Sequence, residues 1–129
     1  MRENLFHGKR KDNGEWVEGY YVPVGEYHYI LTGKLGLVSY LGFEHFLVIP
    51  ETVGQYIELP DKNGKKIFEG DIVRDAETSE VGKIFFDKYA AMFVIGFENT
   101  IADFNASYNL EVIGNIYDNS ELIGGETNG

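Results

Sequence analysis

Three histidines are the side chains best suited to bind a metal or to transfer a proton, and they are far apart in the sequence. His7, His28 and His45 lie in separate segments, and none belongs to a ligand motif such as HExxH. The chain has no cysteine, which excludes thiolate nucleophiles, disulfides and cysteine-based zinc sites. We therefore predict no metal site and no cofactor, and we expect His28 to lie on the polar face of a strand.

The carboxylates of residues 61–73 provide two further candidate sites. Asp61 begins the sequence DKNG, which is typical of a calcium-binding EF-hand loop, but the glycine and glutamate that such a loop requires are replaced here by Lys66 and Ile72. Glu69 and Asp71 would share one face of a strand and could act as acid and base. Since carboxylates are abundant in this chain, we assign them no role. The sequence thus indicates no catalytic, cofactor-binding or metal-binding residue, and binding residues stay unknown.

The phrase that contains these carboxylates occurs twice, as KDNGEWVEGYYV in residues 11–22 and DKNGKKIFEGDIV in residues 61–73. Asn-Gly between apolar segments is typical of a hairpin with a type I′ turn, in which both central residues have positive φ. We predict such turns at Asn13-Gly14 and Asn63-Gly64. The glycine of each Glu-Gly pair, Gly19 or Gly70, is expected at a bend or bulge with positive φ. Whether the two phrases reflect a true duplication is left open.

The rest of the chain has the pattern of short strands. Tyr27, Tyr29 and Leu31 alternate with Glu26 and His28, and short apolar segments follow at residues 45–50, 71–74, 82–87, 89–97 and 110–117. The 16 glycines and the lack of a long helical period argue against a helical fold. At most a short terminal helix is expected, with Asp118 or Asn119 as its cap.

These patterns predict a mainly β protein. Residues 61–129 are expected to form a small, strongly bent SH3-like barrel. Residues 1–60 are expected to form an N-terminal β subdomain of additional hairpins, either as a second small barrel or as strands added to the first. Together they would make one domain.

The charge of the chain is −10 and is unevenly distributed. Lysines and arginines surround the two Asn-Gly pairs, whereas no Lys or Arg follows Lys88. A phosphate backbone would be repelled by that acidic half, so direct nucleic-acid binding is disfavoured. Two interpretations remain: a solvated surface that confers solubility, which we favour, or a surface that binds a basic partner.

Location and assembly follow from the apolar segments. The first 16 residues have no apolar core of a secretory signal, and the longest apolar segment, residues 89–97, is far shorter than the roughly 20 residues of a membrane-spanning helix. We therefore expect a cytoplasmic protein without membrane contact. The same apolar segment and its unprotected strand edges predict a homo-oligomer with Phe93, Ile95 or Phe97 near the contact. The alternative is a monomer in which the first sixty residues cover this segment.

Three stretches carry a resemblance to a known family. GKRKDNGEWVEGY in residues 8–20, PETVGQYIELPDKNGKKIFEGDIV in residues 50–73 and VIGNIYDNSEL in residues 112–122 together resemble the YopX family of bacteriophage and prophage proteins. With the strands between them, they span nearly the whole chain. The resemblance implies an SH3-like β-barrel domain and an origin in a phage, or in a prophage of a low-GC Gram-positive bacterium. It implies no activity, because the family has no established catalytic or binding residues.

The functional expectation is therefore a non-enzymatic phage accessory protein of the YopX type that binds a host or phage macromolecule. Two alternatives stay open. One is an acidic decoy that occupies the nucleic-acid-binding surface of a host protein. The other is an enzyme with an unrecognised site. The sequence identifies neither the partner nor the stage of the phage cycle at which the protein acts.

Overall fold

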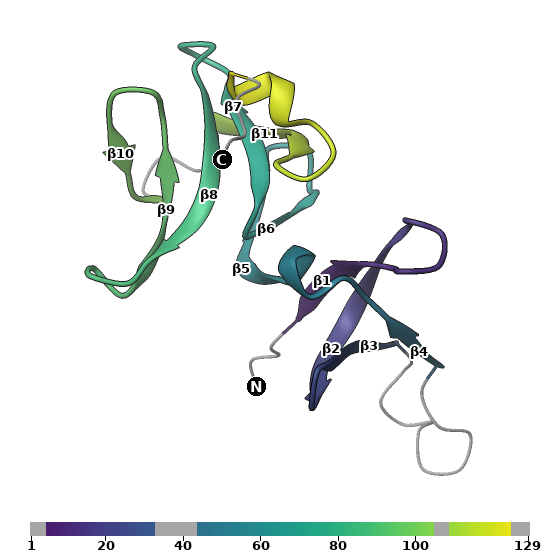
Figure 1. Ribbon diagram of the computed structural model, residues 1–129. Helices are drawn as coiled ribbons and strands as arrows, with labels where there is room; N and C mark the ends of the chain where they lie inside the picture. Colours follow the sequence, from purple (N-terminus) through teal and green to yellow (C-terminus); the bar gives the residue numbers. More distant parts are fainter. Residues whose placement is uncertain (1–4, 33–43, 105–108, 125–129) are drawn as a thin grey trace. The chain divides into compact units, whose positions relative to one another are not determined.

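The computed structural model describes residues 5–32, 44–104 and 109–124, and most of these residues belong to antiparallel strands (Figure 1). The chain divides into two compact units, Met1–Tyr56 and Ile57–Gly129. The division falls inside β5 (Gly54–Pro60), whereas the sequence placed it after residue 60. The mainly β prediction is confirmed, since no described residue is α-helical, and η2 (Pro50–Thr52) and η4 (Ser120–Ile123) are short 3-10 turns.

The first unit is built on an antiparallel sheet with the strand order β4-β3-β2-β1-β5. Its strands are β1 (Phe6–Lys9), β2 (Trp16–Val24), β3 (Tyr27–Thr32), β4 (Glu44–Leu47) and the start of β5. An isolated bridge between Arg10 and Val48 joins the continuation of β1 to the continuation of β4. Ile30 and Val48 are fully buried in this unit.

The first Asn-Gly pair lies in the β1–β2 hairpin, as predicted, but its turn is not of type I′. Residues 11–14 form a four-residue loop, closed by a bond from the Arg10 N–H to the Glu15 carbonyl (2.8 Å). Gly14 has a φ of +77°, whereas Asn13 keeps a negative φ. The Asn13 side chain instead accepts the N–H of Glu15 (2.9 Å), because an asparagine can close a turn with its own side-chain oxygen.

The second Asn-Gly pair also connects two neighbouring strands, β5 and β6 (Lys66–Phe68), and here too the type I′ prediction is wrong. The loop has three residues, with the Gly64 N–H bonded to the Asp61 carbonyl (3.0 Å) and the Asp61 N–H bonded to the Lys65 carbonyl (2.7 Å). Only Gly64 has a positive φ, +86°. Three-residue hairpin loops ordinarily end in such a glycine.

The two Glu-Gly glycines have different environments. Gly70 connects β6 to β7 (Asp71–Asp75) with a φ of +96°, as predicted. Gly19 lies inside β2 and has no positive φ, so the prediction is wrong there. Its requirement is steric, because a Cβ at this position would lie 2.0 Å from the carbonyl oxygen of Leu31 on β3. Glycine in a strand often marks such a close backbone approach.

The second unit contains a five-stranded antiparallel sheet with the order β10-β9-β8-β7-β11. Its remaining strands are β8 (Val81–Asp87), β9 (Met92–Gly96), β10 (Ile101–Ala102) and β11 (Leu110–Asn115). Six strands contribute one buried residue each to a single core: Ile57, Ile67, Val73, Ile84, Ile95 and Leu110. The fold is of the predicted barrel-like class, although the sheets do not close into a full barrel within the described residues.

Two local predictions need correction in this unit. The apolar segment of residues 89–97 is only partly uncovered: Ile95 is 3% exposed in its own unit's core and Phe93 and Phe97 pack against that core, whereas Tyr89 and Met92 are exposed. Ile95 is thus a core residue of its unit, and the predicted homo-oligomer stays a prediction. Asn119 occupies the cap position of η4 but makes no capping bond, since its side-chain oxygen accepts the N–H of Asn115 (3.1 Å).

Candidate functional site

His7 is a structural residue of the first unit. It is 8% exposed, and its ring lies 4.5 Å from the ring of Trp16. Burial lowers the pKa of His7 to about 4, because removal from water disfavours the charged imidazolium. At neutral pH this histidine is an uncharged part of the packing.

The other two histidines also have aromatic partners. His28 is on the face of β3 that contains the buried Ile30, so the prediction that it lies on a polar face is wrong. Its Nδ1 is 2.6 Å from the hydroxyl oxygen of Tyr21, and the two rings stack. His45 is exposed on β4 and lies edge-on to Tyr29 at 5.8 Å. Across the described part of the chain, no three or more His, Asp or Glu side chains are grouped as metal ligands would be.

Asp61 has a structural role that the sequence pattern did not reveal. It is 6% exposed, and its carboxylate accepts three backbone N–H groups, from Asn63 (2.8 Å), Lys65 (2.9 Å) and Val112 (2.8 Å). Desolvation opposes its ionisation, yet these three bonds together lower the pKa of Asp61 below its ordinary value. The carboxylate holds the β5–β6 turn with Oδ1 and attaches it to β11 with Oδ2.

Glu69 and Asp71, considered as an acid–base pair, do not share a strand face. Glu69 and Asp71 flank Gly70 in the turn between β6 and β7, so they are not two residues of one strand face. Asp71 is 5% exposed, and its Oδ2 accepts the N–H of Phe68 (2.8 Å). This buried carboxylate fixes the turn.

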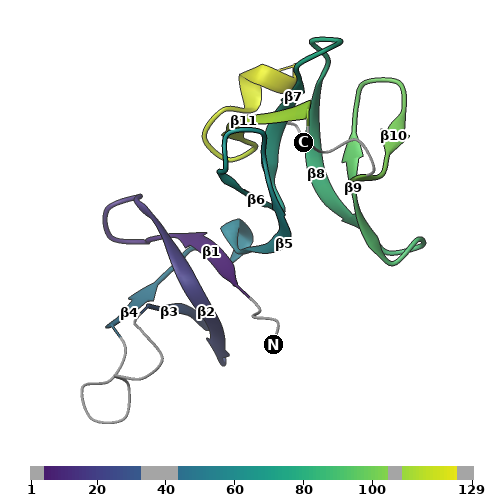
Figure 2. The ribbon, with the colours of Figure 1, turned by 180° about the vertical axis from the view of Figure 1, so that it is seen from behind.

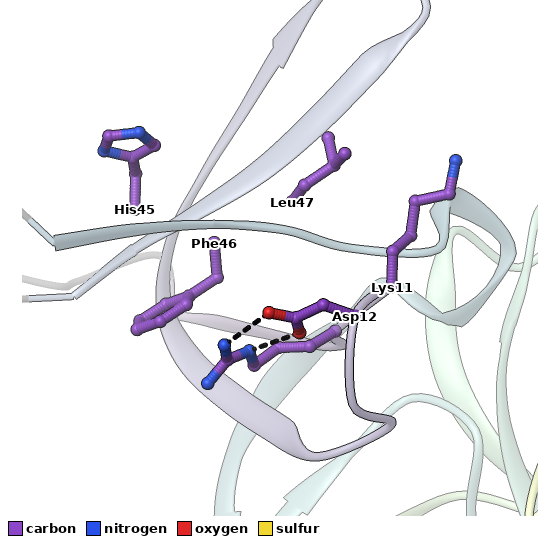
Figure 3. Close-up of a pocket in the computed structure, with 6 residues that line it drawn as sticks. Lys11, Asp12, His45, Phe46 and Leu47 are labelled. Atoms are coloured by element: carbon purple, nitrogen blue, oxygen red, sulfur yellow. Dashed lines mark hydrogen bonds and ion pairs between the residues drawn. The ribbon is translucent and has the colours of Figure 1, made fainter.

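A pocket of about 380 Å³ opens on the first unit beside the first hairpin turn (Figure 3). The Arg10 guanidinium donates two hydrogen bonds to Asp12 (3.0 and 2.7 Å) and lies 4.4 Å from the centre of the Phe46 ring. The hydrogen bond from Arg10 is the main cause that lowers the pKa of Asp12. His45 extends from the opposite side of β4 to Phe46 (Figure 3), so the polar groups of this pocket do not converge on one point.

A more extensive feature is the outer face of the first unit's sheet. Cross-strand partners share a face of a sheet, and the register pairs Tyr20 with Leu31, Val22 with Tyr29 and Val24 with Tyr27. β4 adds His45 and Leu47, opposite Leu31 and Tyr29. We call this set the apolar face; it consists of Tyr20, Val22, Val24, Tyr27, Tyr29, Leu31, His45 and Leu47.

The apolar face lies opposite the core side of the same strands. Ile30 is fully buried on the core side, whereas Val24 is 56% exposed and Tyr27 52% exposed. The sequence alternation predicted a strand with Tyr27 and Tyr29 on one face. It did not identify that face as the exposed one, because the polar His28 and Thr32 share the other face with the buried Ile30.

No described segment forms a helix long and apolar enough to cross a membrane.

Comparison with known proteins identifies the family and shows similarity to solved structures. Residues 6–124 match the family described as YopX protein. No curated protein matches the chain. Among solved structures, the crystal structure of protein EF1440 from Enterococcus faecalis is similar, with a TM-score of 0.60 and 21% sequence identity over 95% of this chain and 99% of that one. At this identity the likeness supports the fold alone. Since the family match extends over nearly all of the sequence, the chain belongs to the YopX family.

Proposed function

We propose that this protein is a non-enzymatic phage or prophage accessory protein that binds a host or phage protein through the apolar face. The observation that carries the proposal is the exposure of Val24 and Tyr27 at the end of a three-stranded apolar surface. Contiguous exposed apolar surface on a folded unit generally marks an interaction site.

The chemistry of this face favours a protein partner over a nucleic acid. Its eight residues include four aromatic rings and four aliphatic side chains, and none is Lys or Arg. Single-stranded nucleic acid can stack on tyrosines, but such sites combine the rings with a positively charged groove. Tyrosine and other aromatic residues are also enriched at the buried centre of protein interfaces. We place the protein in the bacterial cytoplasm, as its prophage-like family implies.

The charge difference between the units supports a second candidate function. Residues 1–56 hold five Lys and Arg and seven Asp and Glu, whereas residues 57–129 hold six and fourteen. The first unit therefore carries a charge of −2 and the second −8. Such a surface could occupy the basic, nucleic-acid-binding site of a host protein, which is the decoy alternative.

Affinity capture from a Gram-positive host lysate distinguishes these functions, provided that it is repeated at low and high salt with matched variants. Val24→Asp places a charge on the apolar face, and Ile101→Asp places the same charge at a residue of similar exposure (58%) on β10. We expect wild type and Ile101→Asp to retain one protein at high salt and Val24→Asp to lose it.

Three outcomes contradict this proposal. Equal capture by Val24→Asp would exclude the apolar face as the site. A basic partner that is released by salt and retained by Val24→Asp would support the decoy, because screening weakens exposed charge interactions. No partner at either salt concentration would favour the third class, an enzyme with an unrecognised site.

A further inference from the structure

The β8–β9 hairpin of the second unit ends in an exposed apolar turn. We call Phe86, Lys88, Tyr89 and Met92 the hairpin tip. Tyr89 is 89% exposed, and Phe86 and Met92 are 45% and 41% exposed. In both views of the ribbon, β8 and β9 run side by side to this turn (Figures 1 and 2). Large apolar side chains rarely gather at an exposed turn without a function.

Hydrogen bonds to Asp87 and one positive φ define the backbone of this tip. The Asp87 carboxylate accepts the N–H of Tyr89 (2.9 Å) and the N–H of Ala90 (3.3 Å), which fixes the start of the turn. Ala91 has a φ of +57°, a conformation that usually requires glycine or asparagine. Local strain of this kind is common where a loop is shaped for binding. A preformed tip loses little conformational entropy when it binds.

A groove of about 620 Å³ lies at the other end of the same hairpin. Its apolar wall is formed by Phe97, Leu122 and Ile123, and the last two are 37% and 39% exposed. Ligand pockets of roughly 300–1,000 Å³ accept drug-sized molecules, so this groove has room for a tyrosine and a methionine side chain. Two carboxylates and one ammonium group line it: Glu80, Glu98 and Lys83.

The tip cannot occupy the groove of its own molecule. The register places the Asp87–Met92 pair at the tip and the Lys83–Gly96 pair at the groove, four residues away along β8. At 3.3 Å per residue the two ends are about 13 Å apart along one continuous hairpin. Figure 2 shows η4, which supplies part of the groove, near the start of β8 and away from the turn.

We infer that the hairpin tip of one molecule binds the groove of a second copy, so that the second units associate head to tail. The tip carries one ammonium group, Lys88, 5.5 Å from the Tyr89 ring centre, and one carboxylate, Asp87, whose Oδ1 accepts the N–H groups of the turn. In the groove, carboxylates outnumber ammonium groups. An apolar projection that offers the Lys88 ammonium thus matches an apolar groove in which Glu80 and Glu98 outnumber Lys83. Contacts between two different surfaces of one chain produce chains or rings of molecules rather than a closed two-fold dimer.

Light scattering across a dilution series tests this inference. We expect the mass of wild type to rise above 14.6 kDa with concentration, while Tyr89→Ser and Ile123→Glu stay at that mass. The informative sample is an equimolar mixture of these two variants. One supplies an intact groove and the other an intact tip, so the mixture should form a dimer of twice the monomer mass and no larger species.

Charge variants of the tip and the groove provide a second test, with Lys62→Glu as the control. Lys88→Glu should reduce association, and Glu98→Lys should restore it when the two variants are mixed. Lys62→Glu makes the same charge change at an exposed turn residue outside both surfaces and should associate as wild type does. Thermal melting of each variant should match wild type, because the substituted side chains are exposed. A wild-type mass of 14.6 kDa up to millimolar concentration, or a mixture that remains monomeric, would overturn the inference.

Discussion

The two copies of the Asn-Gly and Glu-Gly phrase are nearly the same in sequence and different in structure. In the first copy, Asp12 lies on the surface and pairs with Arg10, while the turn has four residues. In the second, Asp61 is buried, accepts three backbone N–H groups and begins a three-residue turn. The order KDNG against DKNG makes this difference, because Asp is favoured at the first position of a β-turn, where its side chain reaches the following N–H groups.

The two copies also differ in the spacing from the glycine of Asn-Gly to the glycine of Glu-Gly. Gly19 follows Gly14 by five residues, whereas Gly70 follows Gly64 by six. Side chains alternate between faces along a strand, so a difference of one residue changes which face a position occupies. Gly19 consequently remains inside β2 against the backbone of Leu31, and Gly70 forms the turn after β6. Similar local sequence therefore encodes a close approach in one unit and a positive φ in the other.

The largest expected effect is at Gly19. Gly19→Val should lower the free energy of unfolding by at least ~3 kcal/mol, since overpacking against backbone cannot be relieved by a change of rotamer. Denaturant unfolding monitored by the fluorescence of Trp16, the one tryptophan, measures this loss in the first unit. Glu18→Val, an exposed change in the same strand, is the control. Equal midpoints for the two variants would show that β2 and β3 can separate without loss.

The second effect is a difference in pH response. Because the folded pKa of His7 is about 4 and the unfolded value is 6.5, the unfolded chain binds the proton first as the pH falls. The first unit should lose up to about 3 kcal/mol between pH 6.5 and 4. The stabilisation from Asp61, whose pKa is lowered, is lost only as the pH falls below its ordinary value of 3.8.

Thermal melts at several pH values, with Trp16 fluorescence for the first unit, test this difference. His7→Phe should remove the pH dependence in that window, and His45→Gln, a change at an exposed residue, should preserve it. A wild-type first unit whose stability is constant from pH 6.5 to 4 would contradict the burial of a neutral His7.

The third effect compares the two aspartates. Asp61→Ala should cost about 2 kcal/mol, because a buried ionised acceptor of three backbone N–H groups is removed. Asp12→Ala should cost less than about 0.5 kcal/mol, as expected of an exposed ion pair. Denaturant melts of both variants provide the comparison. Equal losses would mean that the two turns depend on their aspartates in the same way.

The smallest effect compares two glycines of the second copy. Gly70→Val and Gly64→Val each force a non-glycine residue to a positive φ, with an expected loss of roughly 1–2 kcal/mol. Gly70→Val should be the more destabilising, because a Cβ at Gly70 would lie 3.2 Å from the Tyr117 ring. A Cβ at Gly64 would meet no other atom within 4 Å. Urea midpoints of the two variants measure the difference. A larger loss at Gly64 would mean that the Tyr117 ring moves away freely.

The sequence by itself determined the mainly β class, the two hairpins at the Asn-Gly pairs and the family, because these depend on local residue preferences and on motifs that are continuous in the chain. It also predicted a positive φ at Gly70 correctly. It could not distinguish Gly70 from Gly19, because the atom that excludes a side chain at Gly19 belongs to Leu31 on another strand.

Only the tertiary structure decided which faces are buried. Tyr29 and Ile30 are both apolar neighbours in β3, and the packing of Ile30 in the core directs Tyr29 outward to the apolar face. Ile95 is covered by strands of its own unit, whereas Tyr89 and Met92, in the same apolar segment, are left exposed at a turn. Burial depends on what the rest of the chain places over a residue, and the alternation of Tyr27 and Tyr29 with His28 in β3 does not determine it.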